Sequence, residues 1–151
     1  MAIDSDALAT RIFRSLMEFM PLFHRHLMPS LAVDLKESMG LGRSHAKALI
    51  VLANGGPATP TELGRSMAMT KACLTGLVDE LEAQGLVERV SDEKDRRKSV
   101  VSPTELGIKR AGEVMDAWTS SLGASLATHA PDDLERVAAG IEQLVEALKR
   151  L

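Results

Sequence analysis

Residues 70–101 read TKACLTGLVDELEAQGLVERVSDEKDRRKSVV, and this stretch decides the fold. Thr70 is a preferred N-cap residue, Gln84-Gly85 is a preferred helix end, and the apolar residues between them recur at helical spacing. Two short β-prone runs, 87–90 and 99–102, follow and bracket a charged tip. The stretch therefore predicts a helix that leads directly into a β-hairpin. The helix would bury Leu74, Leu77, Val78 and Leu81 and expose Lys71, Thr75 and Asp79.

A second, shorter helix is predicted just before this one. The segment 59–62, Thr-Pro-Thr-Glu, has the form of a capping box, with Thr59 as N-cap, proline at the first helical position and Glu62 at the third. It opens a helix over 63–67, and Ala68-Met69 forms the turn into the helix that follows Thr70. Upstream, we expect Ser44 to cap a helix over 45–53 that stops at the Asn-Gly-Gly-Pro sequence.

Longer helices are predicted at both ends of the chain. An amphipathic stripe over 7–27 predicts a first helix capped by Asp4 or Ser5, kinked at Pro21 and ended by Pro29, with a short helix over 31–38 after it. After the hairpin, Ser102 or Thr104 caps a helix that reaches about His129, and Asp132-Asp133 begin the last helix. The apolar faces of the first and last helices exceed what a small central module can cover. We therefore expect them to pair with each other or with a second subunit.

The overall charge excludes a nucleic-acid partner that is held by bulk positive charge alone. Eighteen Lys and Arg stand against twenty-one Asp and Glu, which gives a net charge of −3. Between Arg89 and Lys98, however, five basic residues face three acidic ones, so the hairpin has a local charge of +2. An anionic partner would therefore meet a local patch. The start of the chain lacks the pattern of a signal peptide and no run of eighteen apolar residues occurs, so we expect a cytoplasmic protein without membrane contact.

Helix, tight turn, helix and charged hairpin, in this order, predict a winged helix-turn-helix. In that arrangement the second helix, called the recognition helix, enters the major groove of DNA and the hairpin, called the wing, flanks it. The order and spacing alone leave open a small helical domain with an incidental, solvated hairpin.

Several motifs resemble the MarR family of transcriptional regulators. They are TELGRSM at 61–67, TKACLTGLVDELEAQGLVER at 70–89, Asp95-Arg96-Arg97, and TELG at 104–107. The resemblance implies a mainly α-helical fold with a small β-hairpin wing in one domain over 1–151, with dimerisation helices in 1–38 and 108–151 and a DNA-binding region over 44–107. It also implies a homodimer that binds a pseudo-palindromic operator in double-stranded DNA, acts as a repressor and is released by a small aromatic or amphiphilic ligand.

The resemblance also implies which residues contact DNA. In the wing, Arg97 would reach a narrow minor groove, Asp95 would orient its guanidinium, and Arg96 and Lys98 would add basic contacts to the DNA. On the recognition helix, Thr70 would place its backbone N–H and hydroxyl near a phosphate at the helix N-terminus. Lys71 would reach a phosphate or a base edge, and Thr75 would face the groove. Taken alone, Thr70 is simply an N-cap, and both roles are compatible. The residues that would bind the ligand stay unknown.

Two residues of the recognition helix depart from the family pattern. Gly76 stands where many relatives have Arg, and Glu80 stands where Arg or Lys is frequent, so the helix offers fewer cationic contacts. Together with the negative net charge, these departures motivate a second hypothesis beside the DNA-binding repressor: a winged-helix protein-interaction module without operator binding. A search for an inverted repeat upstream of the gene and a gel shift with that DNA would separate the two.

The sequence does not indicate enzymatic chemistry, a cofactor or a metal. No Gly-rich phosphate loop, nucleophile elbow or zinc-ligand motif occurs. His24 and His26 are two residues apart and point in different directions on a helix, and the other two histidines are His45 and His129. Cys73, the single cysteine, is expected to be a small packing or groove-facing residue. Met17, Met20, Trp118 and His45 are conceivable ligand-lining residues, but for each of them packing in the core is the simpler expectation.

Overall fold

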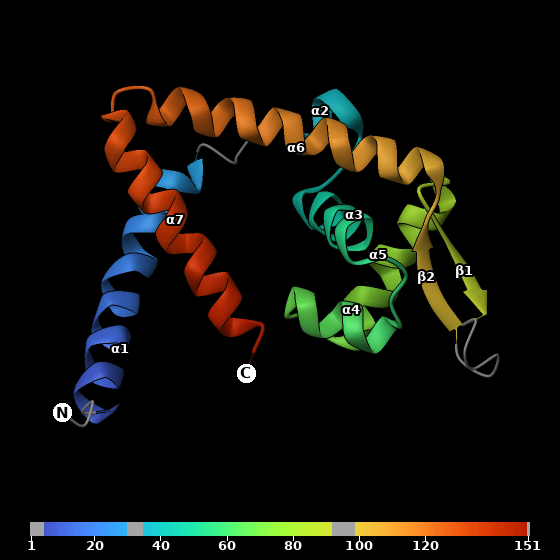
Figure 1. Ribbon diagram of the computed structural model, residues 1–151. Coiled ribbons are helices and arrows are strands. Elements are labelled where there is room, and N and C mark those ends of the chain that lie inside the picture. The colour runs from blue at the N-terminus through green and yellow to red at the C-terminus, as the bar shows by residue number, and fades with distance from the viewer. Residues whose placement is uncertain (1–4, 30–34, 92–98, 151) are drawn as a thin grey trace. The chain divides into compact units, whose positions relative to one another are not determined.

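The computed structural model describes residues 5–29, 35–91 and 99–150 and consists of helices and one antiparallel hairpin (Figure 1). This confirms the expected fold class. The elements in order are α1 (Ser5–Leu22), the π-helix η1 (Phe23–Leu27), α2 (Leu35–Met39), α3 (Arg43–Gly55), α4 (Pro60–Met67), α5 (Lys71–Ala83), β1 (Val87–Ser91), β2 (Ser99–Pro103), α6 (Glu105–Leu126) and α7 (Pro131–Leu148). No described helix is both long and apolar enough to cross a membrane.

The chain folds as two compact units. One unit comprises residues 33–118, and the other combines 1–32 with 119–151. Helix α6 passes from the first unit into the second, because the division falls within it at 118/119. The domain limits expected from the sequence stay a prediction.

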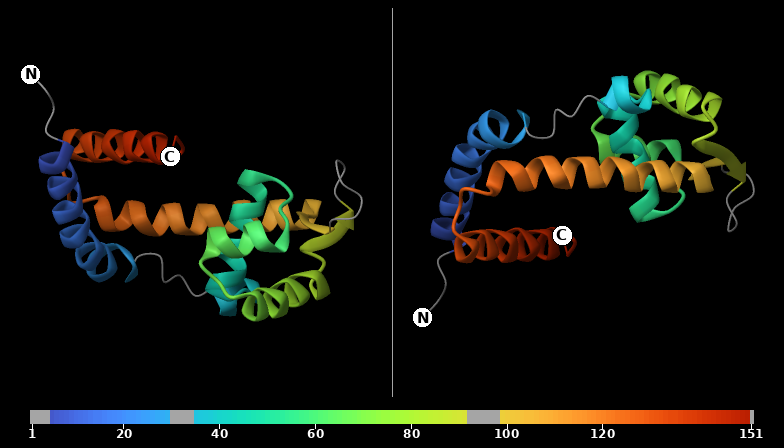
Figure 2. Two further views of the ribbon diagram at one scale, coloured as in Figure 1. Left: turned by 90° about the horizontal axis from the view of Figure 1, so that it is seen from below. Right: turned by 90° about the horizontal axis from the view of Figure 1, so that it is seen from above.

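The unit over 33–118 contains the hydrophobic core. Helices α3, α4 and α5 gather around it, and the hairpin lies at the edge of this bundle (Figure 2). The completely buried large side chains come from each of these elements, from the loop before α3 and from the first half of α6, so distant segments share one core. They are Leu41, Leu49, Leu52, Leu63, Leu81, Val78, Val87, Val101 and Val114.

The hairpin is tied to the helical bundle on one side. β1 and β2 pair antiparallel, with Val87 opposite Pro103 and Ser91 opposite Ser99. On the edge of β2 that does not face β1, Val101 pairs with Ala58. The Ala58 N–H donates to the Val101 carbonyl at 3.1 Å, and the Val101 N–H donates to the Ala58 carbonyl at 2.8 Å. Because Ala58 lies just before α4, this bridge connects the base of the hairpin to the start of the helix-turn-helix.

The start of α6 resolves an open alternative. The Gly107 N–H donates to Thr104 Oγ1 at 3.1 Å, and the Thr104 hydroxyl donates to the Gly85 carbonyl at 2.7 Å. Thr104, not Ser102, is therefore the cap. Its hydroxyl also connects α6 to the turn that ends α5.

The expected limits of several helices were wrong by a few residues. Ser44 is not the cap of α3, because the helix begins at Arg43 after Gly42, which has extended φ and ψ angles and makes no side-chain cap. The described part of the helix expected over 31–38 is α2, Leu35–Met39, which ends one residue later than expected, and residues 31–34 lie outside the described residues. Helix α6 ends at Leu126 instead of about His129, and Pro131 is the first residue of α7.

The first helix changes its hydrogen-bonding pattern after Pro21. Proline has no N–H to donate and its ring crowds the preceding turn. The α-helix ends one residue later at Leu22, and η1 follows, where the Met28 N–H donates to the Phe23 carbonyl at 3.0 Å. The cap proposed at Asp4 lies outside the described residues.

The terminal helices have apolar faces that this chain does not bury. Neither α7 nor η1 has a buried residue, and the described side chains of α1 are exposed. Ile12 is 57% exposed and Ile141 is 52% exposed. The expectation of core packing is therefore wrong for Met17 and Met20 in a single chain, whereas Trp118 and His45 are half-buried.

Candidate nucleic-acid interface

Helix α4 begins with the capping box that the sequence predicted. The Glu62 N–H donates to Thr59 Oγ1 at 3.3 Å, and the Thr59 N–H donates to the Glu62 carboxylate at 2.8 Å. The helix ends in a tight turn at Ala68, whose φ of 53° lies in the left-handed region. The Met69 N–H donates to the Gly64 carbonyl at 3.0 Å and closes the turn. This turn sets the direction of the next helix.

Helix α5 has the two faces expected of a recognition helix. Thr70 is its N-cap and accepts a hydrogen bond from the Cys73 N–H at 3.4 Å. The predicted apolar face is buried, while Lys71, Thr75 and Asp79 are exposed. The Thr75 hydroxyl donates to the Lys71 carbonyl at 2.9 Å. Its proton is therefore used within the helix, and its oxygen keeps a free lone pair.

A cleft of about 500 Å³ lies between α4 and the start of α5. Arg65 of α4 and Lys71 of α5 are its two cations, and buried Gly64 and Leu74 contribute to its apolar lining. Sequence reasoning missed Arg65 as a candidate contact. The only signal was its exposed place opposite Leu63 and Met67, and that signal does not reveal that α5 passes beside it.

Each acidic residue of α5 has a side-chain partner on another element. His45 of α3 lies 2.8 Å from the Glu80 carboxylate, and the His45 side chain is only 18% exposed. Arg89 of β1 binds both Asp79 and Glu82. The hydrogen bond that the Arg89 guanidinium donates to Asp79 raises the pKa of Arg89 above its ordinary value.

The structure brings together only part of the predicted site. Thr70, Lys71 and Thr75 share the exposed N-terminal surface of α5. Asp95, Arg96, Arg97 and Lys98 lie outside the described residues, and their roles stay predictions. Cys73 is exposed on α5. Over the described ranges, no three His, Cys, Asp or Glu side chains are grouped so that they could hold a metal ion.

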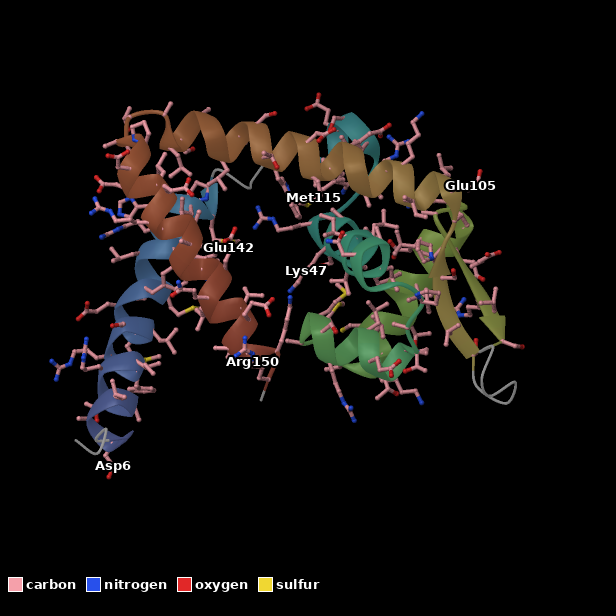
Figure 3. All side chains as sticks on the ribbon, in the orientation of Figure 1. Asp6, Lys47, Glu105, Met115, Glu142 and Arg150 are labelled. Atoms are coloured by element: carbon pink, nitrogen blue, oxygen red, sulfur yellow. The ribbon has the colours of Figure 1, made fainter. Side chains whose placement is uncertain are left out.

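A smaller groove of about 240 Å³ lies between α3 and α6 within the core unit. Met115 extends from α6 on the side where α3 lies (Figure 3). Ile50, Ala53, Ile108, Ala111 and Gly112 complete its apolar lining, and Asn54 adds a polar amide. None of the four side chains that the sequence suggested as ligand-lining residues is among them.

Together, the tight turn, the exposed helix and the hairpin define a winged helix-turn-helix protein of the DNA-binding class. Comparison with known proteins agrees: residues 39–98 match the model of the MarR family. The chain is 32% identical over 118 residues to the HTH-type transcriptional regulator YfiV of Bacillus subtilis, covering 77% of this chain and 74% of that protein. This chain belongs to the MarR family of transcriptional regulators.

Further comparisons cover most of the chain. The HTH-type transcriptional repressor YetL of Bacillus subtilis is 29% identical over 111 residues, which are 72% of this chain and 66% of that protein. The structure of a MarR family protein from Bacillus stearothermophilus superimposes with a TM-score of 0.74 at 21% identity, covering 98% of this chain and 99% of the other. The second comparison shows the shared fold.

Proposed function

We propose that this protein is a repressor that binds, as a homodimer, a pseudo-palindromic operator and is released by a small aromatic or amphiphilic ligand. The observation that carries the proposal is the surface formed by Thr70, Lys71 and Thr75 beside Arg65, on a helix whose other face is anchored in the core. The likeness to a relative named as a repressor supports the direction of control. A regulator of transcription acts where the DNA is, so we propose that it works in the cytoplasm.

The N-terminal end of α5 would provide most of the direct contacts. Its free backbone N–H groups and its dipole favour a phosphate near Thr70. Lys71 and Arg65 would hold phosphates on the two sides of the cleft between α4 and α5. Because the Thr75 hydroxyl already donates to the Lys71 carbonyl, its oxygen would accept from an amino group on a base edge. Such donors in the major groove are the amino groups of adenine and cytosine.

The wing would supply the second contact. We propose that Arg97 enters a narrow, A/T-rich minor groove, that Asp95 orients it, and that Arg96 and Lys98 bind phosphates. The antiparallel pairing of β1 and β2 and the Ala58–Val101 bridge would give this tip a fixed base.

The homodimer would join the unburied apolar faces of α1 and α7 to those of a second copy. A two-fold dimer presents two recognition helices, which read half-sites about one helical turn apart. The ligand would bind in the groove between α3 and α6, where Met115, Ile50 and Ile108 could cover one aromatic ring and Asn54 could bind its polar group. For the ligand to release the protein from DNA, it must bind more tightly to the form of the dimer in which the spacing of the two recognition helices does not fit DNA.

A gel shift with the DNA upstream of the protein's own gene tests operator binding. We expect a complex at a much lower protein concentration than with a scrambled duplex of equal length. The bound segment should contain an inverted repeat. Equal binding to both duplexes at a fixed salt concentration would favour the alternative, an interaction module without an operator.

Filling the groove between α3 and α6 tests the ligand. Met115→Trp should leave operator affinity unchanged and abolish the weakening of DNA binding by small aromatic acids, because the larger side chain occupies the groove. A panel of such compounds that weakens the wild type and the variant alike would exclude this groove. A panel that affects neither would remove the ligand from the proposal.

A further inference from the structure

Arg89 connects the base of the wing to the recognition helix. It lies in β1, and its guanidinium donates through one nitrogen to Asp79 and through another to Glu82. These two carboxylates are one turn apart on α5 and come from its exposed surface. The Arg89 side chain is two-thirds covered. One planar side chain therefore bridges a strand and a helix at two points.

We infer that Arg89 is a positioning residue that locks the wing to the recognition helix, and that operator recognition by the wing depends on this link. The inference rests on the proposed function, since it assumes that the wing contacts DNA. We refer to Arg89, Asp79 and Glu82 as the clamp.

The geometry of the clamp favours positioning over simple charge balance. A single exposed ion pair contributes little to stability, because water screens it and two long side chains must be ordered. Two carboxylates that bind different nitrogens of one rigid guanidinium restrict the rotation of that group as well as its distance from the helix. Lysine has a single ammonium group on a flexible stem and would fix the strand less firmly.

The position of Arg89 in the hairpin determines what the clamp can do. Helix α5 ends at Ala83, and the turn through Gly85 sets only where β1 begins. Arg89 lies two residues into β1, opposite Val101, beyond the reach of that turn. β2 is held to the bundle by Ala58, and the clamp holds β1 from the other side. The two attachments together would fix the angle at which the wing leaves the helix.

The clamp also changes the charge that each element presents to DNA. With Arg89 engaged by Asp79 and Glu82, residues 90–98 retain four basic and three acidic residues, a net charge of +1 instead of the +2 that includes Arg89. In return, Arg89 offsets one of the two negative charges that Asp79 and Glu82 place on the exposed surface of the recognition helix, so the clamp keeps a net charge of −1. An experiment must therefore separate positioning from neutralisation.

Four variants make this separation. Arg89→Ala removes the cation, and the double variant Asp79→Asn with Glu82→Gln removes its partners while keeping Arg89. Glu80→Gln is the matched control, because Glu80 is an acidic residue of the same helix but is paired with His45. Arg89→Lys keeps the charge without the two-point link. Thermal melting identifies any variant that does not fold, and the double variant keeps the test valid if Arg89→Ala is such a case.

The first measurement is amide hydrogen exchange in the free protein. We expect exchange in β1 and β2 to become at least about threefold faster in Arg89→Ala and in the double variant, because local opening becomes easier. Glu80→Gln should leave these rates unchanged. Unchanged hairpin rates in both clamp variants would overturn the inference without any reference to DNA.

The second measurement is the ratio of affinities for the operator and a scrambled duplex. In the wild type, Arg97→Ala should lower this ratio roughly 5- to 150-fold, the range for loss of a specific arginine contact. In the Arg89→Ala background, the same change should alter the ratio less than about twofold, the scatter expected between independent sites. The double variant should also lower the ratio while it tightens binding to scrambled DNA, because two negative charges are gone.

The outcomes separate the inference from the proposed function. If the wild type does not discriminate between the duplexes, the proposed function is wrong and the DNA half of the inference is wrong with it. If the wild type discriminates but Arg89→Ala and Arg97→Ala act independently, only the inference is overturned. Recovery of the full ratio by Arg89→Lys would also overturn it, since charge alone would then be enough.

Discussion

At the scale of single residues, Gly107 is a position where the packing of the backbone restricts which amino acid can be accommodated. The Leu86 carbonyl accepts a hydrogen bond from the Thr104 N–H at 3.1 Å, which holds the first turn of α6 against the end of α5. A Cβ atom added at Gly107 would lie 1.9 Å from this carbonyl oxygen. The obstacle is backbone, which cannot rotate away as a side chain would. The glycine is therefore required by the close approach of two segments.

Gly107→Ala is expected to destabilise the protein by about 1–3 kcal/mol, the usual cost of overpacking a close contact. Urea denaturation monitored by circular dichroism measures the change. Gly112→Ala in the same helix is the control, because a Cβ there meets nothing within 4 Å. It should stabilise by roughly 0.5–1 kcal/mol, as alanine restricts the unfolded chain more than glycine does. Equal effects at both positions would contradict the steric argument.

Arg97 and Lys98 are expected to make different contributions to DNA binding, Arg97 to sequence preference and Lys98 to affinity for any sequence. Arg97→Ala should cost on the order of 1–3 kcal/mol of operator binding and flatten the preference for A/T pairs under the wing. Lys98→Ala should weaken binding to all DNA sequences about equally. It should also lower the salt slope, which is the slope of log affinity against log salt concentration, by about one unit. Titrations against operator and scrambled duplexes at several salt concentrations measure both effects.

Two further variants sharpen this comparison. Arg97→Lys should resemble Arg97→Ala, because lysine is more strongly hydrated and lacks the flat guanidinium that a narrow groove admits. Asp95→Ala should reduce specificity more than affinity. If Arg97→Ala and Lys98→Ala behave alike on both duplexes, the wing is only an electrostatic tether.

At the scale of the element, α5 has a well-capped N-terminus but few basic residues. Thr70 caps it, and Lys71 is the single basic residue among its thirteen. Glu80, a departure from the family pattern, is paired with His45 of α3 instead of being presented alone. Gly76, the other departure, is exposed and has open space where a Cβ would lie. The helix therefore has room for a contact that the sequence omits.

Gly76→Arg is expected to tighten binding to operator and scrambled DNA alike and to raise the salt slope by about one unit, since it adds one phosphate contact. Gly76→Ala is the matched control, because it raises helix propensity without adding charge. It should stabilise the fold and leave the salt slope unchanged. An unchanged slope in Gly76→Arg would mean that this face of α5 does not approach the phosphates.

At the scale of the whole molecule, the two units differ in what they bury. The buried apolar side chains of the described chain all lie between Leu35 and Val114. Helices α1 and α7 instead present large apolar side chains to solvent, among them Phe13 at 63% exposure. Apolar faces of this size normally mark an interface. A second copy of the chain is the partner that the proposed function requires.

Ile12→Asp combined with Ile141→Asp is expected to convert the dimer to a monomer, because a charge in each apolar face would be buried without a partner. Sedimentation at micromolar concentration measures the mass. Gln143→Asp is the control, since helical periodicity puts position 143 on the opposite face of α7 from Ile141. A wild type that sediments as a monomer of 16.3 kDa would contradict the proposed dimer.

The sequence by itself determined the order of the elements and, apart from the π-helix η1, their type. The capping box at Thr59, the cap at Thr70 and the apolar spacing of α5 all act between residues at most four apart, so they are visible in a linear pattern. The hairpin followed from two β-prone runs of equal length. These local signals were enough for the fold class and for the exposed surface that begins at Thr70.

The tertiary structure alone decided which distant residues meet. The His45–Glu80 pair joins positions 35 apart, and the clamp joins Arg89 to carboxylates seven and ten residues away on another element. Thr104 and not Ser102 caps α6, and the Thr104 hydroxyl also donates a hydrogen bond to the carbonyl of Gly85, which is distant in sequence. Such contacts depend on how helices and strands cross. The crossing is set by the packing of a shared core, to which residues from the whole segment between Leu35 and Val114 contribute at once.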